Sequence, residues 1–169
     1  MENSKKSADL PLCRIGMAGL DTSHVPAFAT LLHDAAHEHH VPGARVVAAF
    51  PGGSPDFPLS ADRVEGFTAE LRDKHGVEIV TSLSGLRGKC DAVMLESIDG
   101  RVHWEQFREV AEWGVPVFID KPLTLLAEEA REIARLAEER GVRNPEGVSP
   151  ITYNSALSQK EFRILPAWC

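Results

Sequence analysis

Short apolar runs alternate with longer amphipathic segments along most of this chain. Five runs have the length and composition of buried strands, at residues 13–18, 44–50, 77–80, 92–96 and 115–119. Between these runs, apolar residues recur at three- and four-residue spacing, which is typical of helices with one buried face. Strands that alternate with helices predict a parallel sheet covered by helices. We therefore expect a doubly wound α/β domain.

The expected helices are placed by their apolar faces and by the residues at their ends. They cover residues 25–40, residues 61–75 up to Gly76, a segment from about residue 104 to Gly114, and residues 126–140 up to Gly141. Their inward residues are predicted to be Phe28, Leu31, Leu32 and Ala35; Val64, Phe67 and Leu71; Trp104, Phe107, Val110 and Ala111; and Leu126, Ala130, Ile133 and Ala137. Residues 51–58 contain three prolines and two glycines, so we expect a loop there.

One domain accounts for most of the 169 residues. We expect it to cover residues 12–142, after a polar, flexible arm at residues 1–11. Residues 143–169 show no clear period, although residues 151–154 have the composition of a sixth strand. We interpret this last segment as a tail, or as a remnant of the start of a second domain.

Composition and charge narrow the class of protein. The net charge of -7 and pI near 5.5 give no basic stripe for nucleic acid. No run approaches the roughly 20 apolar residues of a membrane span, and the N-terminus lacks the apolar core of a signal peptide. Cys13, Cys90 and Cys169 are too far apart for a thiolate metal site. We expect a cytoplasmic protein that binds neither nucleic acid nor membranes; its oligomeric state stays open, a homo-oligomer included.

Ligands of doubly wound sheets bind beyond the carboxyl ends of the strands, where the strand order reverses. The loop after the first strand carries Gly19, Leu20, Asp21, Thr22, Ser23 and His24. Gly19 stands where the first glycine of a dinucleotide-binding turn belongs, but Asp21 and His24 replace the second and third. The hydroxyls of Thr22 and Ser23 are able to donate to a phosphate, or one of them simply caps the following helix. Residues 52–54 form either a small anion-binding nest or, as we favour, an ordinary turn.

The loop after the fifth strand carries the most specific motif. Asp120-Lys121-Pro122 follows the apolar run Val117-Phe118-Ile119, and His103 follows the fourth strand. With the apolar run at residues 91–95 and the Glu/Ala/Arg-rich last helix, this pattern resembles the Gfo/Idh/MocA oxidoreductase family. That family has an N-terminal Rossmann domain with a Glu-Lys-Pro motif after its fifth strand. The resemblance covers about residues 14–142.

The resemblance implies hydride transfer between a nicotinamide cofactor, NAD or NADP, and a hydroxyl of a sugar or polyol. Lys121 would be the catalytic residue, since an ammonium group beside a reacting hydroxyl stabilises the developing alkoxide. The expected cofactor-binding residues are Gly19, Leu20, Asp21, Thr22, Ser23, His24, Glu96, His103, Asp120, Lys121 and Pro122. No metal site is expected.

Several positions depart from the family pattern. Asp120 replaces the usual glutamate and is expected to hold Lys121 differently. Gly100 stands where the family has an asparagine, and Asp99 has a simpler interpretation as a helix cap. The family's second α/β domain, which binds substrate and supplies a histidine, has no counterpart, because no histidine follows His103. We therefore expect no independent turnover from this chain.

Two interpretations from other classes compete with this one. The first is a non-catalytic Rossmann scaffold for protein interaction or regulation, which Asp21 and the missing second domain favour. The second, more remote, is a zinc-binding hydrolase, because His33 and His37 are four residues apart in the expected first helix. That histidine cluster lies at the far end of the helix from the ligand edge, so a solvated helix end is the simpler interpretation.

Overall fold

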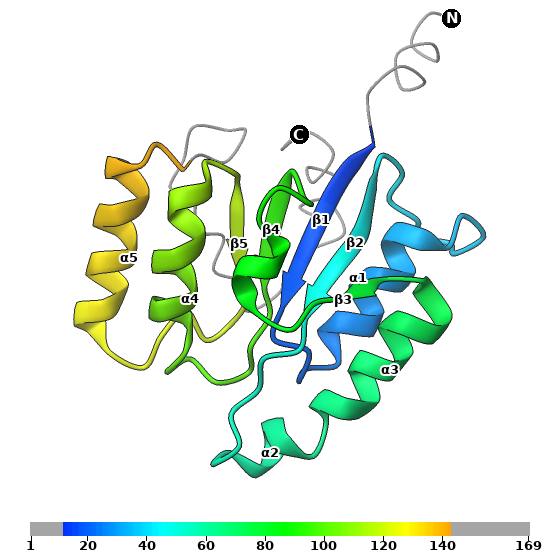
Figure 1. The fold of residues 1–169 in the computed structure, drawn as a ribbon, viewed down its shortest axis with the longest axis horizontal. Helices are drawn as coiled ribbons and strands as arrows, with labels where there is room; N and C mark the ends of the chain where they lie inside the picture. The colour runs from blue at the N-terminus through cyan, green and yellow to red at the C-terminus, as the bar shows by residue number, and fades with distance from the viewer. Residues whose placement is uncertain (1–11, 143–169) are drawn as a thin grey trace, which may run out of the picture.

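A five-stranded, wholly parallel sheet forms the centre of the molecule in a computed structural model that describes residues 12–142 (Figure 1). The strands are β1 (Cys13–Ala18), β2 (Ala44–Phe50), β3 (Glu78–Ile79), β4 (Ala92–Leu95) and β5 (Val117–Ile119). Their order is β3-β2-β1-β4-β5. The chain winds outward from β1 to one edge and then returns to β4 and the other edge. The doubly wound prediction is confirmed.

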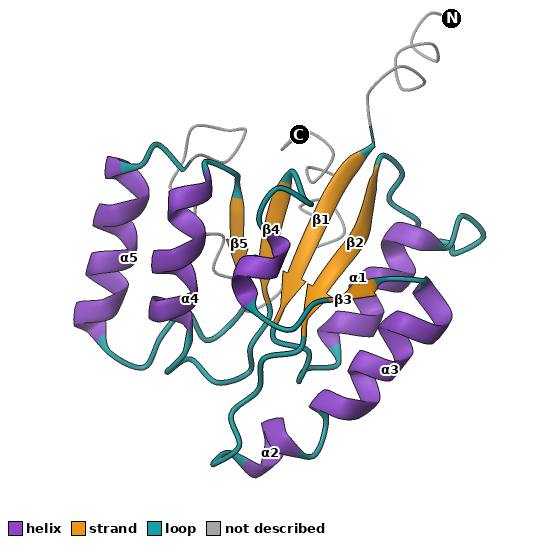
Figure 2. Ribbon diagram, in the orientation of Figure 1, coloured by secondary structure: helices purple, strands orange, loops and turns teal. Residues whose placement is uncertain are grey.

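Helices cover both faces of the sheet, which gives three layers (Figure 2). The helices are α1 (His24–His33), α2 (Pro58–Ala61), α3 (Val64–His75), α4 (His103–Val110) and α5 (Ala127–Glu139), with short 3₁₀ turns at Leu83–Leu86 and Ala111–Trp113. Helices α1 and α3 lie on one face, and α4 and α5 lie on the other. Successive side chains of a strand point to opposite faces, so Met17 packs on the α1 side and Ala18 on the α4 side. Strands buried on both faces are continuously apolar, as β1 and β4 are.

The first helix is shorter than its sequence pattern predicts. It ends at His33, where the backbone becomes extended at Asp34, and the residues up to 40 form turns. The His33 side chain turns toward β2, and its Nε2 accepts the Val46 N–H at 3.0 Å. Burial lowers the pKa of His33 to about 4. His33 and His37 therefore do not share a helix face, and the arrangement on which the zinc-hydrolase interpretation depends is wrong.

Several other boundaries differ from the prediction. The helix expected at 61–75 is divided into α2 and α3, and β3, β4 and β5 are shorter than their apolar runs. Leu126 is 59% exposed rather than buried, because it precedes the first turn of α5. Ala130 is only partly buried, whereas Ile133 and Ala137 lie in the core as expected.

Some predictions lie outside the described residues, namely the arm at 1–11, the strand at 151–154 and the tail at 143–169. Within residues 12–142, none of the helices combines the length and the apolar character that a bilayer crossing requires.

Candidate functional site

The loops after β1, β4 and β5 contact one another at the carboxyl edge of the sheet. A Cβ atom on Gly19 would lie 2.2 Å from Ser97 Oγ and 2.4 Å from Ser97 N, and Gly19 has a φ of 85°. A Cβ on Gly100 would lie 3.0 Å from Cγ of Pro122. Only glycine allows the backbones to approach this closely. The sheet edge therefore brings together all the loops that the sequence singled out.

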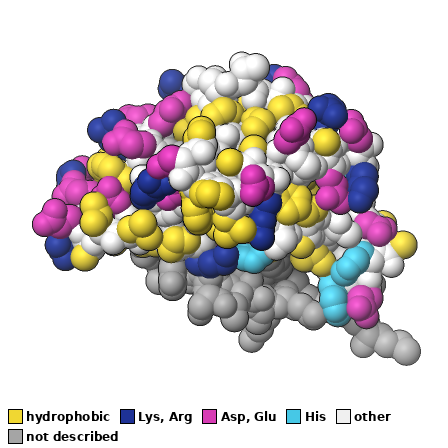
Figure 3. Space-filling model, turned by 90° about the horizontal axis from the view of Figure 1, so that it is seen from below, with side chains coloured by type: hydrophobic (Ala, Val, Ile, Leu, Met, Phe, Trp, Pro, Cys, Tyr) yellow, Lys and Arg dark blue, Asp and Glu magenta, His cyan; other side chains and the backbone are white. Residues whose placement is uncertain are grey.

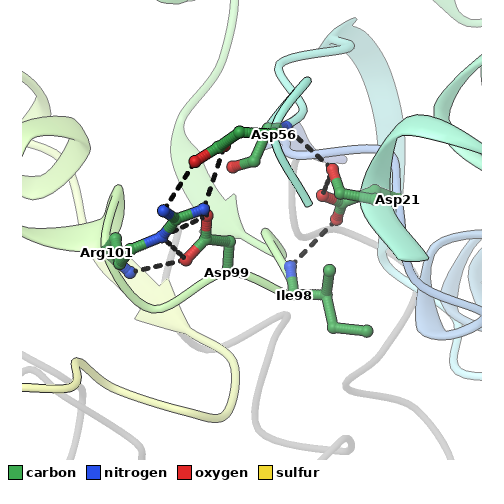
Figure 4. A network of polar contacts seen from close by, with 7 residues as sticks. Asp21, Asp56, Ile98, Asp99 and Arg101 are labelled. Carbon is green, nitrogen blue, oxygen red and sulfur yellow. Dashed lines mark hydrogen bonds and ion pairs between the residues drawn. The ribbon is translucent and has the colours of Figure 1, made fainter. Parts of the chain in front are cut away.

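Asp21 lies fully buried in the turn after β1, with both carboxylate oxygens bonded (Figure 4). Its Oδ1 accepts the Ile98 N–H at 2.9 Å, and its Oδ2 accepts the hydroxyl of Ser60 at 2.6 Å. The Ser60 hydroxyl oxygen in turn accepts the Ser54 N–H at 2.8 Å. The carboxylate thus joins the turn to α2 and to the loop after β4, and the Ser54 amide is not part of an open anion nest.

The neighbouring backbone amides of the turn also have protein partners. Gly19 N–H donates to the Phe50 carbonyl at 3.1 Å, and Leu20 N–H donates to the Pro51 carbonyl at 2.7 Å. A pyrophosphate held by a glycine-rich turn needs free N–H groups and close access to the backbone at the second glycine. Here that second position is Asp21, which carries a buried negative group. These residues do not fit a pyrophosphate held in that manner.

The start of α1 is bonded only weakly by the turn's hydroxyls. Thr22 Oγ1 accepts the His24 N–H at 3.4 Å, which is a long hydrogen bond at the start of α1. Thr22 therefore caps the helix weakly. Ser23 occupies the N-cap position but makes no side-chain cap bond, and its side chain is exposed.

Arg101 links the two loops that flank Asp21 (Figure 4). Its guanidinium donates to Asp56 at 2.8 and 3.0 Å and to Asp99 at 2.7 Å. These bonds lower the pKa of Asp99 to about 2. Asp99 was expected to cap α4, but that helix begins after Val102 without a side-chain cap, and Asp99 instead accepts the Arg101 N–H at 3.0 Å. Arg101 thus connects the loop after β2, which carries Asp56, to the loop after β4, which carries Asp99.

A second polar cluster lies where α1, β4 and β5 meet. His24 Nδ1 and Asp120 Oδ2 are 2.6 Å apart, so Asp120 bonds to the histidine rather than to Lys121. Glu96 is fully buried, and neither of its carboxylate oxygens has a hydrogen-bond partner within residues 12–142. One donor atom from each of His24, Glu96 and Asp120 lies within 4.8 Å of the other two. Burial, followed by the charge of Asp120, raises the pKa of Glu96 well above its usual value.

Lys121 lies half-buried beside this cluster, where its charge acts on Glu96. Its ammonium group forms no ion pair or hydrogen bond with any side chain of the described range. The Lys121–Pro122 peptide bond is cis. The Pro122 carbonyl accepts a bond from His103 Nδ1 at 2.8 Å.

His103 is the other unsatisfied group of this edge. Its Nδ1 faces two carbonyl oxygens, those of Pro122 at 2.8 Å and Leu123 at 3.2 Å, so Nδ1 carries the hydrogen. Its buried Nε2 has no hydrogen-bond partner among the residues that the structure describes. Burial lowers the pKa of His103, which favours the neutral ring with Nε2 as an acceptor. The edge thus offers an ammonium donor and unpaired acceptors on Glu96 and His103, a set that suits a ligand with several hydroxyl groups.

Sequence reasoning identified the residues that carry this chemistry but not those that hold them. Ser60, Asp56 and Arg101 were not singled out, although all three contact Asp21 or its neighbours. Ser60 bonds to Asp21, 39 positions away, and Asp56 bonds to Arg101, 45 positions away, so no local pattern reveals these contacts. Figure 3 shows this edge from below, with acidic and basic side chains interspersed and hydrophobic ones between them.

Solved structures share this fold at low sequence identity. The apo scyllo-inositol dehydrogenase of Lactobacillus casei aligns with 19% identity and a TM-score of 0.63, over 86% of this chain and 37% of that one. The myo-inositol dehydrogenase of the same organism, solved with NAD(H) and myo-inositol, aligns with 19% identity and a TM-score of 0.58, over 85% and 36%. The UDP-N-acetylglucosamine 3-dehydrogenase of Acidithiobacillus ferrooxidans aligns with 23% identity and a TM-score of 0.55, over 78% and 36%. The chain spans little more than a third of the length of these enzymes.

No curated protein sequence matches the chain. A family model does match, over residues 15–147, and its description is an oxidoreductase family with an NAD-binding Rossmann fold. The match covers most of the chain and contains every residue of the site described above. This protein belongs to the Gfo/Idh/MocA family of oxidoreductases.

Proposed function

We propose that residues 12–142 are the Rossmann domain of a family member that acts on a hydroxyl of a sugar or polyol, with Lys121 contacting that hydroxyl. The observation that carries the proposal is the Lys121 ammonium group, half-buried at the end of β5 and without a protein partner in the described range. The unpaired acceptors of Glu96 and His103 support it, because buried polar groups left unpaired cost about 1–3 kcal/mol each. Hydroxyl groups of a ligand would satisfy both.

The roles of the residues follow from their chemistry. The Lys121 ammonium donates a hydrogen bond to the ligand oxygen and is suited to stabilise negative charge that develops there. His103 Nε2 accepts a bond from a second hydroxyl, which orients the ligand.

The family's cofactor class is NAD or NADP, but the turn around Asp21 does not fit its pyrophosphate. We therefore assign no step to a dinucleotide and infer that this chain by itself binds the polyol without turning it over. A non-catalytic role on the same scaffold is the second candidate, and the buried, doubly bonded Asp21 favours it. In that case the polyol would be a bound signal rather than a substrate.

Calorimetric titration of the purified chain with myo-inositol, a panel of other polyols and sugars, and NADH would test the proposal. We expect at least one polyol to bind, no saturable NADH binding, and no reduction of NAD or NADP. Lys121→Ala should weaken polyol binding at least tenfold, whereas the matched control Lys74→Ala, at an exposed ion pair on α3, should not. Polyol binding that survives Lys121→Ala, or the absence of any polyol binding, would refute the proposal; robust turnover would refute the inference about oxidation.

A further inference from the structure

We propose that His24, Glu96 and Asp120 form a binding site for one divalent transition-metal ion of the Zn²⁺ type. The sequence alone predicts no metal site. The three residues come from different parts of the chain, since His24 begins α1, Glu96 follows β4 and Asp120 follows β5. They converge only because the sheet order places β1, β4 and β5 side by side.

The donor atoms have the spacing that a metal ion needs. Three atoms at about 2.0–2.2 Å from a tetrahedral ion lie roughly 3.4 Å from one another. Here the Nδ1 of His24 and one oxygen each of Glu96 and Asp120 already lie within 4.8 Å of one another, and the His24–Asp120 pair is at 2.6 Å. Small side-chain rotations bring all three to a common centre. One imidazole nitrogen and two carboxylate oxygens make a donor set that zinc accepts, with a fourth position left for water or a ligand.

Glu96 provides the independent evidence for a ligand. It is fully buried, and both of its oxygens lack hydrogen-bond partners. Buried carboxylates are normally paired with a cation, hydrogen-bonded or bound to a metal. Glu96 meets none of these conditions through direct bonds in the described range, although its carboxylate is among the three donor groups. A metal ion at the centre of the cluster would satisfy it.

The charge around the cluster also favours a cation. Glu96, Asp120 and Asp21 are all buried, at 0%, 2% and 0% exposure, and the charges of the other two act on Glu96. Lys121 is the one basic side chain whose charge is seen to act on Glu96. The nearby acid Asp99 is already neutralised by Arg101. A divalent ion would balance the excess negative charge, whereas an anionic ligand would add to it.

Metal binding requires the lone pair of His24 Nδ1. The ring hydrogen of a neutral His24 then lies on Nε2, and the Nδ1 that contacts Asp120 is free to bind the ion.

The test uses the full chain, stripped of metal with EDTA and titrated with ZnCl₂ by calorimetry, with bound zinc counted by atomic emission after gel filtration. Glu96→Gln keeps the shape and removes the charge, and Asp120→Asn does the same at the second carboxylate. The matched control is His39→Ala, because His39 and His37 form an exposed ring pair capable of holding zinc nonspecifically. Circular dichroism of each variant verifies folding. Replacing zinc with Co²⁺ adds an absorption spectrum that reports the coordination geometry.

We expect one zinc ion per chain, a loss of affinity of at least tenfold in Glu96→Gln and Asp120→Asn, and no change in His39→Ala. Cobalt should give the intense visible bands of a four- or five-coordinate site in the unaltered chain but not in Glu96→Gln. Absence of bound zinc would overturn the proposal. So would zinc that is retained by folded Glu96→Gln or lost in His39→Ala, because either result would place the ion at the surface histidines.

Discussion

The hydroxyl of Ser60 donates to the carboxylate of Asp21 at 2.6 Å, which ties α2 to the turn after β1. The other oxygen of that carboxylate accepts the Ile98 N–H at 2.9 Å. An internal carboxylate thus occupies the position where the turn of a dinucleotide-binding domain would open to its ligand. The arrangement explains how this chain keeps the fold of its family while its turn differs from the glycine fingerprint.

Replacing Asp21 should reopen the turn. In Asp21→Gly the carboxylate is absent, so we expect NADH affinity to rise at least tenfold, equivalent to about 1.4 kcal/mol. The same change leaves the Ile98 N–H without its partner and should lower the free energy of unfolding by about 1–3 kcal/mol. Fluorescence titration with NADH and urea denaturation measure the two effects. Asp62→Gly, an exposed site with the same change of net charge, should alter neither; equal NADH binding in both variants would contradict the role given to Asp21.

Glu96→Gln should stabilise the metal-free protein at neutral pH. The folded-state pKa of Glu96 is raised above its ordinary value of 4.5, so ionisation of this group favours the unfolded state. Stability is therefore lost as the pH rises from about 4.5 through the folded-state pKa. The free energy of unfolding of the variant should therefore be larger than that of the unaltered chain at pH 7.5. The difference should vanish below pH 4.5, and urea denaturation in EDTA at both pH values measures it. A difference that is the same at both would show that Glu96 does not titrate in this way.

Arg101→Ala should loosen the loops that flank Asp21, because it removes the links to Asp56 and Asp99. We expect a lower Tm and faster proteolysis between β2 and α2. The pKa of Asp99 is depressed from 3.8 to about 2, so the stability that this pair contributes is present above about pH 4 and is lost toward pH 2. The difference in Tm between the variant and the unaltered chain should shrink over that interval. Arg72→Ala, at an exposed pair with Asp73, should leave proteolysis unchanged.

Gly19→Ala should destabilise the fold severely. A methyl group there would lie 2.4 Å from the Ser97 backbone nitrogen, at a φ of 85° that disfavours alanine. We expect a loss of more than about 3 kcal/mol, or no folded protein. Gly66→Ala is the matched control, since Gly66 is exposed in α3 with no atom within 4 Å of its added methyl. It should gain about 0.5–1 kcal/mol. Thermal unfolding followed by circular dichroism compares the two variants. A Gly19→Ala variant that folds with the stability of the unaltered chain would refute the close contact.

The sheet and its carboxyl-edge loops were predictable because they depend on local pattern. Continuous apolar runs identify β1, β2 and β4, and the strand–turn–helix rule then locates the ligand edge. The end of α1 was not predictable in the same way. The residues beyond His33 carry helix-compatible side chains, but the His33 ring bonds to the backbone of β2, a contact 13 positions away.

The hydrogen-bond partners of the site residues could not be predicted from the sequence either. Asp120 precedes Lys121 directly, which suggested a local pair, yet its carboxylate bonds to His24, 96 positions away. Asp21 looked like an obstacle to phosphate, but nothing near it in the chain indicates Ser60 or Ile98 as its partners. Such contacts arise from how α2 and the loop after β4 cross the sheet edge, which depends on the whole fold.

The contact between Gly19 and Ser97 has a consequence for how a ligand enters. Two loops that touch backbone to backbone cannot part without breaking the end of the parallel ladder between β1 and β4. Recognition at this edge should therefore proceed by lock and key, with free and occupied forms nearly superimposable. Selectivity would then depend on the fixed positions of the polar groups at this edge rather than on any closing motion.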